Sequence, residues 1–326
     1  MDESLIDCVI PTTIETSVRG QSVRVSALRL GDQLIVVQGR LFRLAYRFDE
    51  GWHESHANMT DELLYQIQKI NQHDQRIDVF SFSQMPSDPI PHFFYPHEYE
   101  SIAAIRISSF DDWWNNSVSS DLRKDVRRSA KRGVIVKQVD FDDSLVESIK
   151  GIYDETPIRQ GRKFWHYNQS IEQVKTCNSS YKDRSIFLGA FLEEELIGFT
   201  KIVQVGKMAR MMQILAKDEH RDKRPMNALI AKSVETAYRL ECTMLTYGNY
   251  LYRQGPDSMT AFKQRNGFEE IRVPKYFVPI TARGELYVRY GLYRDGLSLL
   301  PQGVVRAMRR MWKSAFLAVG NRHGNK

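Results

Sequence analysis

Apolar residues in the first third of the chain follow two different spacings. Residues 20–47 alternate apolar and polar positions in short runs separated by turn signals such as Gly31-Asp32, which predicts a small antiparallel sheet. In residues 61–71 the apolar positions recur every three or four residues, which predicts a helix with Asp61 as its cap. The apolar run that follows, RIDVFSFSQM, predicts a buried strand.

After residue 100 the pattern becomes more regular, because strands and helices interleave. The predicted elements are, in order, a strand at 101–107, a helical stretch ending at Gly133, a strand at 134–141, a helix at 144–155, two or three strands over 185–217, a helix at 225–240, a strand at 243–249, a helix at 258–268 and a strand at 269–280. This order predicts an α/β fold of the layered α+β kind, with a mixed central sheet and flanking helices.

The length of 326 residues allows one large domain or two modest ones, since a typical domain has ~150 residues. A polar stretch rich in proline, PSDPIPHFFYPHE, is the best candidate for a linker. We therefore expect a small N-terminal α/β subdomain at 1–100, a main domain at 101–281 and a basic helical tail at 282–326.

Composition and cysteine usage narrow the class of protein. Hydrophobic residues make up 42% and charged residues 26%, which excludes a disordered or collagen-like chain. The three cysteines, Cys8, Cys177 and Cys242, are scattered, so neither a disulfide framework nor a cysteine zinc site is encoded, and we expect no metal. The N-terminus carries acids where a signal peptide carries basic residues, and no apolar run reaches the ~18 residues of a membrane span. A cytoplasmic location is expected.

The net charge of +6 is concentrated in two segments. Residues 121–132 hold six Lys/Arg against two Asp, and residues 304–326 hold six Lys/Arg and no acid. Such patches either face phosphates or a membrane surface or are solvated helix faces. In the second segment a basic amphipathic helix carries Trp312 and Phe316, and this pattern fits both an anionic membrane surface and docking onto the core. If the helix binds an anionic membrane surface, we expect peripheral attachment of the protein at the inner face of the membrane.

Four segments within residues 100–281 carry a resemblance to a known family. They are LRKDVRRSAKRGVIV, FLGAFLEEELIGFTKIV, ILAKDEHRDKRPMNALI and SMTAFKQRNGFEEI. Together they resemble the GNAT acyltransferase superfamily and, within it, the FemAB-like branch of peptidyl and aminoacyl transferases. The resemblance implies a GNAT-like mixed sheet, and residues 20–90 could be a reduced first half of the duplicated FemAB arrangement.

The third segment resembles the loop that binds the donor in this family. The GNAT signature Q/R-x-x-G-x-G/A lets backbone N–H groups close on the pyrophosphate of coenzyme A at a helix N-terminus. Aligned on Arg221, this chain has Arg224 and Met226 in place of the glycines, and FemAB-like proteins also tend to lack them. The resemblance assigns donor binding to seven residues: Leu215, Lys217, Arg221, Lys223, Arg224, Pro225 and Asn227.

The fourth segment points to a catalytic lysine. Many GNAT enzymes place a tyrosine four residues before the glycine of the terminal G-F, but here Lys263 stands before Gly267. FemAB-like transferases commonly have F-K there, as in Phe262-Lys263, and in that family the lysine is thought to stabilise charge in the transition state. An ammonium group can offset a developing oxyanion, whereas a tyrosine suits proton delivery.

Acyl transfer to an amine also needs a deprotonated amine and donors for the oxyanion. In GNAT-like folds these donors are backbone N–H groups, here within Met212–Lys217. Candidates for the base are Asp218, Glu219, His220 and the loop histidine His166, although an acidic pair before a helix often only complements its dipole. Tyr247 could also act at the site, while Tyr250 is predicted to line the acceptor cleft, unless both are core aromatics.

Residues 159–167 combine three cations with three aromatic residues in a loop. This mixture suits a sugar, nucleotide or phosphorylated acceptor, because it supplies stacking and charge together, and a packed loop is the alternative. The residues assigned to the substrate in this loop are Arg159, Arg162, Trp165 and His166.

The leading hypothesis from the sequence is an N-acyltransferase that moves an acyl group from acyl-CoA, such as acetyl-CoA, to an amine by direct attack. The acceptor would be a small molecule or a precursor of a glycan or of the cell envelope. Two alternatives remain open: transfer from aminoacyl-tRNA, and a non-catalytic protein that binds nucleic acid or a membrane surface on a degenerate acyltransferase scaffold.

Overall fold

A computed structural model describes residues 9–18, 21–30, 33–39, 42–52, 61–70, 76–159, 161–251 and 258–293. The basic helix predicted within 304–326, and with it the predicted membrane contact, lies outside the described residues. Within the described part of the chain, no helix is both long and apolar enough to cross a membrane.

The first region of the chain is mainly antiparallel sheet. Its strands are β1 (Val9–Val18), β2 (Gln21–Leu30), β3 (Gln33–Gln38), β4 (Leu44–Arg47) and β5 (Val79–Ser83). Strands β2 to β4 form the antiparallel sheet predicted for residues 20–47, and β1, which lies before that range, extends it by one antiparallel strand. Strand β4 pairs with β5 in parallel. The short 3₁₀ turn η2 (Glu50–Trp52) and helix α1 (Asp61–Ile70) connect the last two strands.

The second region interleaves helices and strands in the predicted order. Its strands are β6 (His97–Arg106), β7 (Val134–Val139), β8 (Ile158–Arg159), β9 (Arg162–Lys163), β10 (Ser185–Leu192), β11 (Glu195–Val205), β12 (Met208–Ala216), β13 (Met244–Asn249) and β14 (Glu269–Pro279). Its helices and helical turns are α2 (Phe110–Asp112), η3 (Trp113–Ser117), α3 (Ser120–Lys131), α4 (Asp143–Asp154), α5 (Ile171–Asn178), η4 (Lys182–Arg184), η5 (Asp218–Lys223), α6 (Pro225–Arg239), α7 (Ser258–Arg265) and α8 (Ala282–Arg289).

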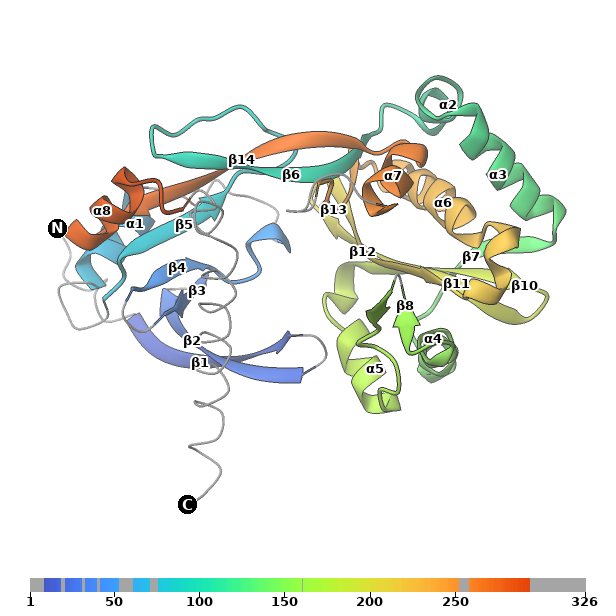
Figure 1. Ribbon diagram of the computed structural model, residues 1–326, viewed down its shortest axis with the longest axis horizontal. Helices are drawn as coiled ribbons and strands as arrows, with labels where there is room; N and C mark the ends of the chain where they lie inside the picture. The colour runs from blue at the N-terminus through green and yellow to red at the C-terminus, as the bar shows by residue number, and fades with distance from the viewer. Residues whose placement is uncertain are drawn as a thin grey trace, which may run out of the picture.

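One sheet of twelve strands runs through both regions, in the order β1-β2-β3-β4-β5-β14-β6-β13-β12-β11-β10-β7. Strand β14 pairs with β5 on one side and with β6 on the other. In Figure 1 the long strands β6 and β14 lie side by side and join the two regions. The proline-bearing segment between β5 and β6 is anchored rather than loose, because the Gln84 side chain donates to the carbonyls of Asp88 and Ile90 at 2.9 and 2.8 Å.

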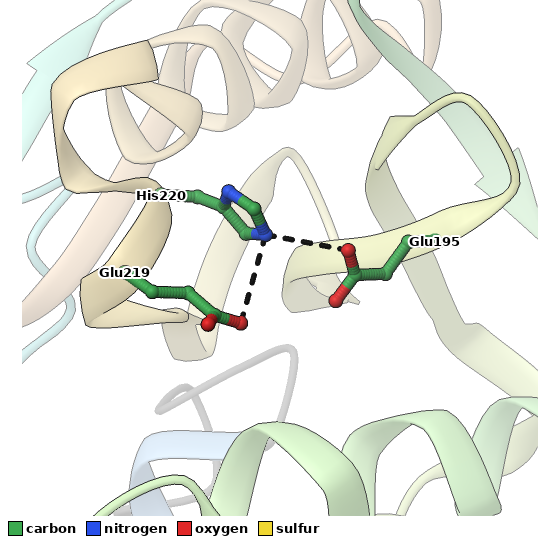
Figure 2. A group of neighbouring side chains, drawn as sticks. All are labelled: Glu195, Glu219 and His220. Atoms are coloured by element: carbon green, nitrogen blue, oxygen red, sulfur yellow. Dashed lines mark hydrogen bonds and ion pairs between the residues drawn. The ribbon is translucent and has the colours of Figure 1, made fainter.

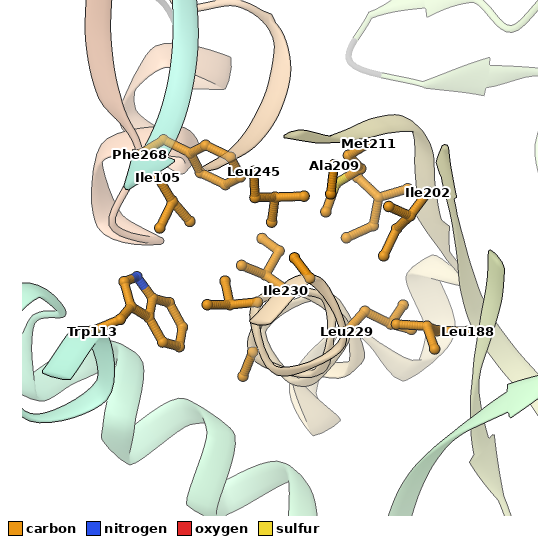
Figure 3. Close-up of a cluster of buried hydrophobic side chains, with 14 of the residues drawn as sticks. Ile105, Trp113, Leu188, Ile202, Ala209, Met211, Leu229, Ile230, Leu245 and Phe268 are labelled. Atoms are coloured by element: carbon orange, nitrogen blue, oxygen red, sulfur yellow. The ribbon is translucent and has the colours of Figure 1, made fainter. Parts of the chain in front are cut away.

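Helices cover both faces of the second region (Figure 1). On one face α6 packs its buried leucine and isoleucine against the sheet and against Trp113 of η3 (Figure 3). On the other face α4 and α5 pack on β10 and β11 through a second apolar cluster. Two layers of helix around a mixed sheet match the fold class that the sequence predicts.

Helix α3 has the predicted cationic surface but a different buried stripe. Ser119 caps it, since its hydroxyl accepts from the backbone N–H of Leu122 at 3.2 Å, and the chain leaves it at Gly133 with a φ of +83°. Leu122 is buried as predicted, yet Ala130 is exposed and Ser129 takes the buried position. The stripe drifts around the helix because 3.6 residues per turn do not keep i, i+4 and i+8 on one line.

Candidate active site

The two central strands of the second region part from each other. β12 and β13 pair in parallel only at Met208–Arg210 and 244–246, and β12 then continues to Ala216 without a partner on that side within the described residues. The pairing of β12 with β11 slips between Lys201 and Ile202, which leaves Met212 as an extra, bulged residue. Backbone groups of β12 beyond Arg210 are therefore available at the gap between the strands, where the sequence predicted the oxyanion donors.

Lys263 lies at the end of this gap. Its side chain is buried, with 1% exposed, and its ammonium group donates to the carbonyl of Asn249, the last residue of β13. The same ammonium lies 4.7 Å from the ring centroid of Tyr247. A buried ammonium beside an aromatic ring is held in a fixed place by its hydrogen bond and by a cation–π contact. The structure thus places the predicted Lys263 and Tyr247 together.

Tyr247 and Tyr250 occupy different positions around β13. Tyr247 is partly buried and its ring packs 5.9 Å from that of Phe268, as a core aromatic does. Tyr250 follows the strand, and its backbone N–H donates to the carbonyl of Ser101 at 2.8 Å while its own carbonyl accepts from Thr260. The second contact ties the end of β13 to α7, which carries Lys263. The roles of both tyrosines at the site stay predictions.

The donor loop has a left-handed residue at the position of the first signature glycine. Arg224, at the position of the first signature glycine, adopts a left-handed conformation with φ of +57° and leads into Pro225, the first residue of α6. The N–H groups of Met226 and Asn227 belong to the first turn of this 15-residue helix and have no carbonyl partner within it. They give the loop a weak anion site at a helix N-terminus.

Most of the predicted donor-binding cations have acidic neighbours. Lys217 pairs with Glu195 and, at 3.4 Å, with Glu219. Lys223 lies 3.5 Å from Asp222, and Arg224 lies 3.3 Å from Asp125 of α3. Arg221 is exposed, Leu215 packs against the α4–α5 cluster, and the Asn227 amide donates to Asn266 at 2.9 Å.

The start of the donor loop is closed by a carboxylate of the protein itself. Glu155, just after α4, accepts from the backbone N–H of Asp218 at 2.8 Å and from that of Glu219 at 3.0 Å. Arg159 holds this carboxylate at 2.9 Å and also donates to the carbonyl of Ala216 at the end of β12. Arg159 therefore links Glu155 and the start of the donor loop to the end of β12. The sequence analysis assigned Arg159 to the substrate and did not predict this structural role.

Glu219 and His220 form a small cluster with Glu195, the first residue of β11 (Figure 2). The Nε2 atom of His220 lies 3.3 Å from Glu195 and 3.6 Å from Glu219. Three such side chains could hold a metal ion, but Lys217 already pairs with both carboxylates and Lys223 lies 3.2 Å from the other ring nitrogen. We assign no metal to this cluster, because two ammonium groups occupy the places that a cation would take.

The predicted acceptor loop splits into exposed and buried parts. Arg162 is exposed, and Trp165 is 43% exposed with its ring tilted by 30° against that of His166 at a centroid distance of 3.4 Å. His166 is buried between Gln169, at 3.3 Å from Nδ1, and Gln213 of β12, at 3.2 Å from Nε2. Burial lowers the pKa of His166 to about 4, so the ring is neutral at pH 7 and is a poor base.

A buried polar network behind this loop was not predicted from the sequence. Tyr153 of α4 donates to the Gln213 side chain at 2.9 Å, and Lys201 of β11 donates to the carbonyls of Asn178 and Ser180 at 2.8 and 2.6 Å. Burial lowers the pKa of Lys201 to about 8. The sequence feature that could have indicated this network was the lysine within the apolar run IGFTKIV. The network holds β11 and β12 at Lys201 and Gln213, the register pair next to the bulge at Met212.

No family model matches the sequence, and no curated protein resembles it in sequence. Solved structures share the fold. FemX superposes with a TM-score of 0.57 at 11% identity, over 86% of this chain and 90% of FemX. L-PGS from Bacillus licheniformis superposes with a TM-score of 0.52 at 12% identity, over 79% of this chain and 86% of that one. The predicted FemAB-like fold of the GNAT type is thereby confirmed.

Proposed function

We propose that this protein is a transferase that moves an activated acyl or aminoacyl group onto an amine. The observation that carries the proposal is the buried ammonium of Lys263 at the end of β13, beside the gap that opens between β12 and β13. A positive charge fixed in a shielded site stabilises a developing oxyanion far more than it would in water.

The reaction is a direct attack of the amine on the carbonyl carbon of the donor. The tetrahedral oxyanion accepts hydrogen bonds from the free backbone of β12 around the bulged Met212, while Lys263 offsets its charge. Collapse of the intermediate breaks the bond to the donor, and the amide product leaves. No side chain of the protein needs to carry the acyl group.

The surface beside the donor loop favours an aminoacyl-tRNA as the donor. Helix α3 packs against α6 and presents three cations to solvent, namely Arg127, Arg128 and Lys131. Ion pairs of Asp125 with Arg224 and of Arg132 with Asp222 join this helix and its C-cap to the donor loop, where Arg221 is also exposed. Several exposed cations on one surface suit a chain of phosphates, whose binding releases counterions. Pro225 has no N–H to offer to a pyrophosphate, and Glu155 already holds two N–H groups of the loop.

Acyl-CoA is the second candidate donor, as the sequence predicted. The left-handed Arg224 and the first-turn N–H groups of α6 favour it, because they keep the local geometry that binds a pyrophosphate. The two donors differ in salt dependence. Binding of tRNA through about four phosphate contacts falls steeply between 50 and 200 mM salt, whereas a small ligand held by one helix N-terminus depends far less on salt.

Lys263→Ala tests the transfer itself. Wild-type protein is given aminoacyl-tRNA, or in parallel acetyl-CoA, with hydroxylamine as a general acceptor, and the hydroxamate is measured by mass spectrometry. Loss of the buried ammonium should lower the rate by about 100-fold or more. Lys207→Ala, at an exposed lysine paired with Glu241, is the matched control and should change nothing. A Lys263→Ala protein that folds by circular dichroism and keeps full activity would rule out the proposed role.

A further inference from the structure

The bulge in β12 turns two successive side chains toward the same face of the sheet. Met211 and Ile214, on either side of it, belong to the apolar cluster under α6. Gln213 instead contacts a side chain of α4, on the opposite face, and the Sδ atom of Met212 lies 3.6 Å from the hydroxyl of Ser180, just after α5. A bulge re-aims side chains in this way, and bulges are frequent beside active sites.

Gln213 is held by hydrogen bonds from three different segments of the chain. The hydroxyl of Tyr153 on α4 donates to its Oε1 atom at 2.9 Å. Its Nε2 atom lies 3.2 Å from the Nε2 atom of His166, in the loop before α5. Its backbone carbonyl accepts from the hydroxyl of Thr200 on β11 at 2.8 Å. Both ends of the side-chain amide and the carbonyl of the residue after Met212 are therefore fixed by side chains.

The neighbouring groups determine which atom donates in each of these bonds. The Asn178 amide donates to the Tyr153 hydroxyl at 3.3 Å, so the hydroxyl gives its own proton to the Oε1 atom of Gln213. The Nε2 atom of Gln213 then donates to an unprotonated Nε2 atom of His166, and the Nδ1–H of the ring donates to Gln169 at 3.3 Å. Rotating the Gln213 amide by half a turn would take the acceptor away from the hydroxyl proton.

This network is packed as well as hydrogen-bonded. Tyr153 and Thr200 are fully buried, and Gln169 and Asn178 are buried as well. The His166 ring lies 4.1 Å from the ring of Tyr153 between centroids. A buried network in which each member has its partner specifies one arrangement, because every alternative leaves a polar group unpaired. The network therefore allows the bulge one position.

We propose that Gln213 is a positioning residue for the transfer reaction, which holds the backbone of the bulge at Met212 where it donates to the oxyanion. This assignment rests on the proposed transferase function. Gln213 acts through the backbone of β12 rather than on the substrate. Beyond Arg210 this strand has no partner on the side of β13 within the described residues. The network thus restrains β12 where a neighbouring strand would otherwise do so.

A positioning role predicts a specific kinetic effect. Oxyanion donors act in the transition state rather than in the ground state, so displacing them lowers kcat and leaves KM for the donor nearly unchanged. A displacement of about 1 Å can cost about 100-fold in rate. A substitution that only loosens the fold would instead lower the melting temperature and leave kcat per folded molecule unchanged.

The test measures kcat and KM of the full-length protein with hydroxylamine and the donor that supports transfer. Gln213→Met keeps the size of the side chain but removes its two hydrogen bonds, and it should lower kcat by about 10- to 100-fold and change KM for the donor by less than about 3-fold. Gln213→Glu can still accept from Tyr153 and should recover part of kcat. Gln204→Met on β11, where the side chain makes one contact of 3.4 Å to the Gly206 carbonyl, is the matched control.

A second variant keeps the test valid if Gln213→Met does not fold by circular dichroism. Tyr153→Phe removes one hydroxyl and keeps the ring, so it should lower kcat in the same way but by a smaller factor. Because both substitutions act on the same hydrogen bond, the double variant should be no slower than Gln213→Met alone.

The outcomes distinguish this role from the function on which it rests. If the wild type transfers to hydroxylamine and Gln213→Met keeps its kcat, or the effects of Gln213→Met and Tyr153→Phe multiply, Gln213 is not a positioning residue and the transferase function stands. Equal losses of kcat in Gln213→Met and in the control Gln204→Met would overturn the role as well. If the wild type transfers from neither donor, the transferase function fails and the role of Gln213 fails with it.

Discussion

The donor loop and the junction strap, residues 48–52, both carry charged side chains but place them in different surroundings. In the donor loop, Asp222 and Glu219 face solvent and pair with lysines at the surface. In the junction strap, Glu50 is partly buried, and this burial raises its pKa to about 8. Exposed ion pairs contribute little stability and respond to salt, whereas shielded charges change proton affinities. The donor loop is therefore suited to phosphate binding, whereas the junction strap ties β12 to the first region and raises the proton affinity of Glu50.

The largest loss of stability and of transfer rate should come from substitution of Arg210, which joins the junction strap to β12. Arg210→Ala removes the bond to Gly51 and the stacking on Trp52, and it leaves Glu100 beside a lost charge. We expect a loss of about 2–4 kcal/mol in the free energy of unfolding and a large fall in transfer rate. Arg210→Lys keeps the charge but not the planar stacking, so it should lie in between. Chemical unfolding measures the first effect; unchanged stability in Arg210→Ala would contradict the role of the strap.

Glu50 should make the stability fall as the pH rises. Its pKa of about 8 in the folded protein lies above the value of about 4.3 in the unfolded chain, so the folded state binds more protons between these values. The stabilisation is fully present below pH 4 and is lost as the pH rises through 8. Since part of the side chain reaches solvent, we expect about 2–3 kcal/mol in total. Glu50→Gln should flatten this decline in urea unfolding between pH 5 and 9, and an unchanged slope would contradict the shift.

His166, in contrast, should make the free energy of unfolding fall as the pH falls. Its pKa of about 4 in the folded protein lies below the value of about 6.5 in the unfolded chain, so the unfolded chain binds more protons between these values. The stabilisation is present above pH 6.5 and is lost as the pH falls toward 4, by up to about 3 kcal/mol. His166→Gln can keep the contacts to Gln169 and Gln213 and should remove this acid limb in the same unfolding experiment. A variant with the wild-type acid limb would show that another group titrates there.

The donor loop and the junction strap also differ in how far their structures could be predicted from the sequence. The donor loop and Lys263 lie in contiguous segments whose residue types carry the resemblance, so the fold and this part of the site were predictable. Arg210 and Gly51 are 159 positions apart, and nothing local to either residue indicates the other. The setting of Glu50 could not be predicted for the same reason. Glu50 is an ordinary surface residue in sequence, and only burial against β5, β6 and β14 changes its chemistry.

The smallest effect on stability should come from the ion pairs of the donor loop, whose carboxylates are exposed. Lys217→Ala removes the contacts to Glu195 and Glu219, and we expect a change of less than about 1 kcal/mol in unfolding free energy. Arg221→Ala should leave stability unchanged as well, because the side chain is exposed. Both variants should instead weaken tRNA binding by a similar factor for every tRNA sequence, and Arg221→Ala should reduce the slope of log affinity against log salt by about 1. Filter binding at four salt concentrations measures that slope. If Arg221→Ala leaves it unchanged, the loop does not contact the phosphates, and the exposed cations of α3 would have to bind the RNA alone.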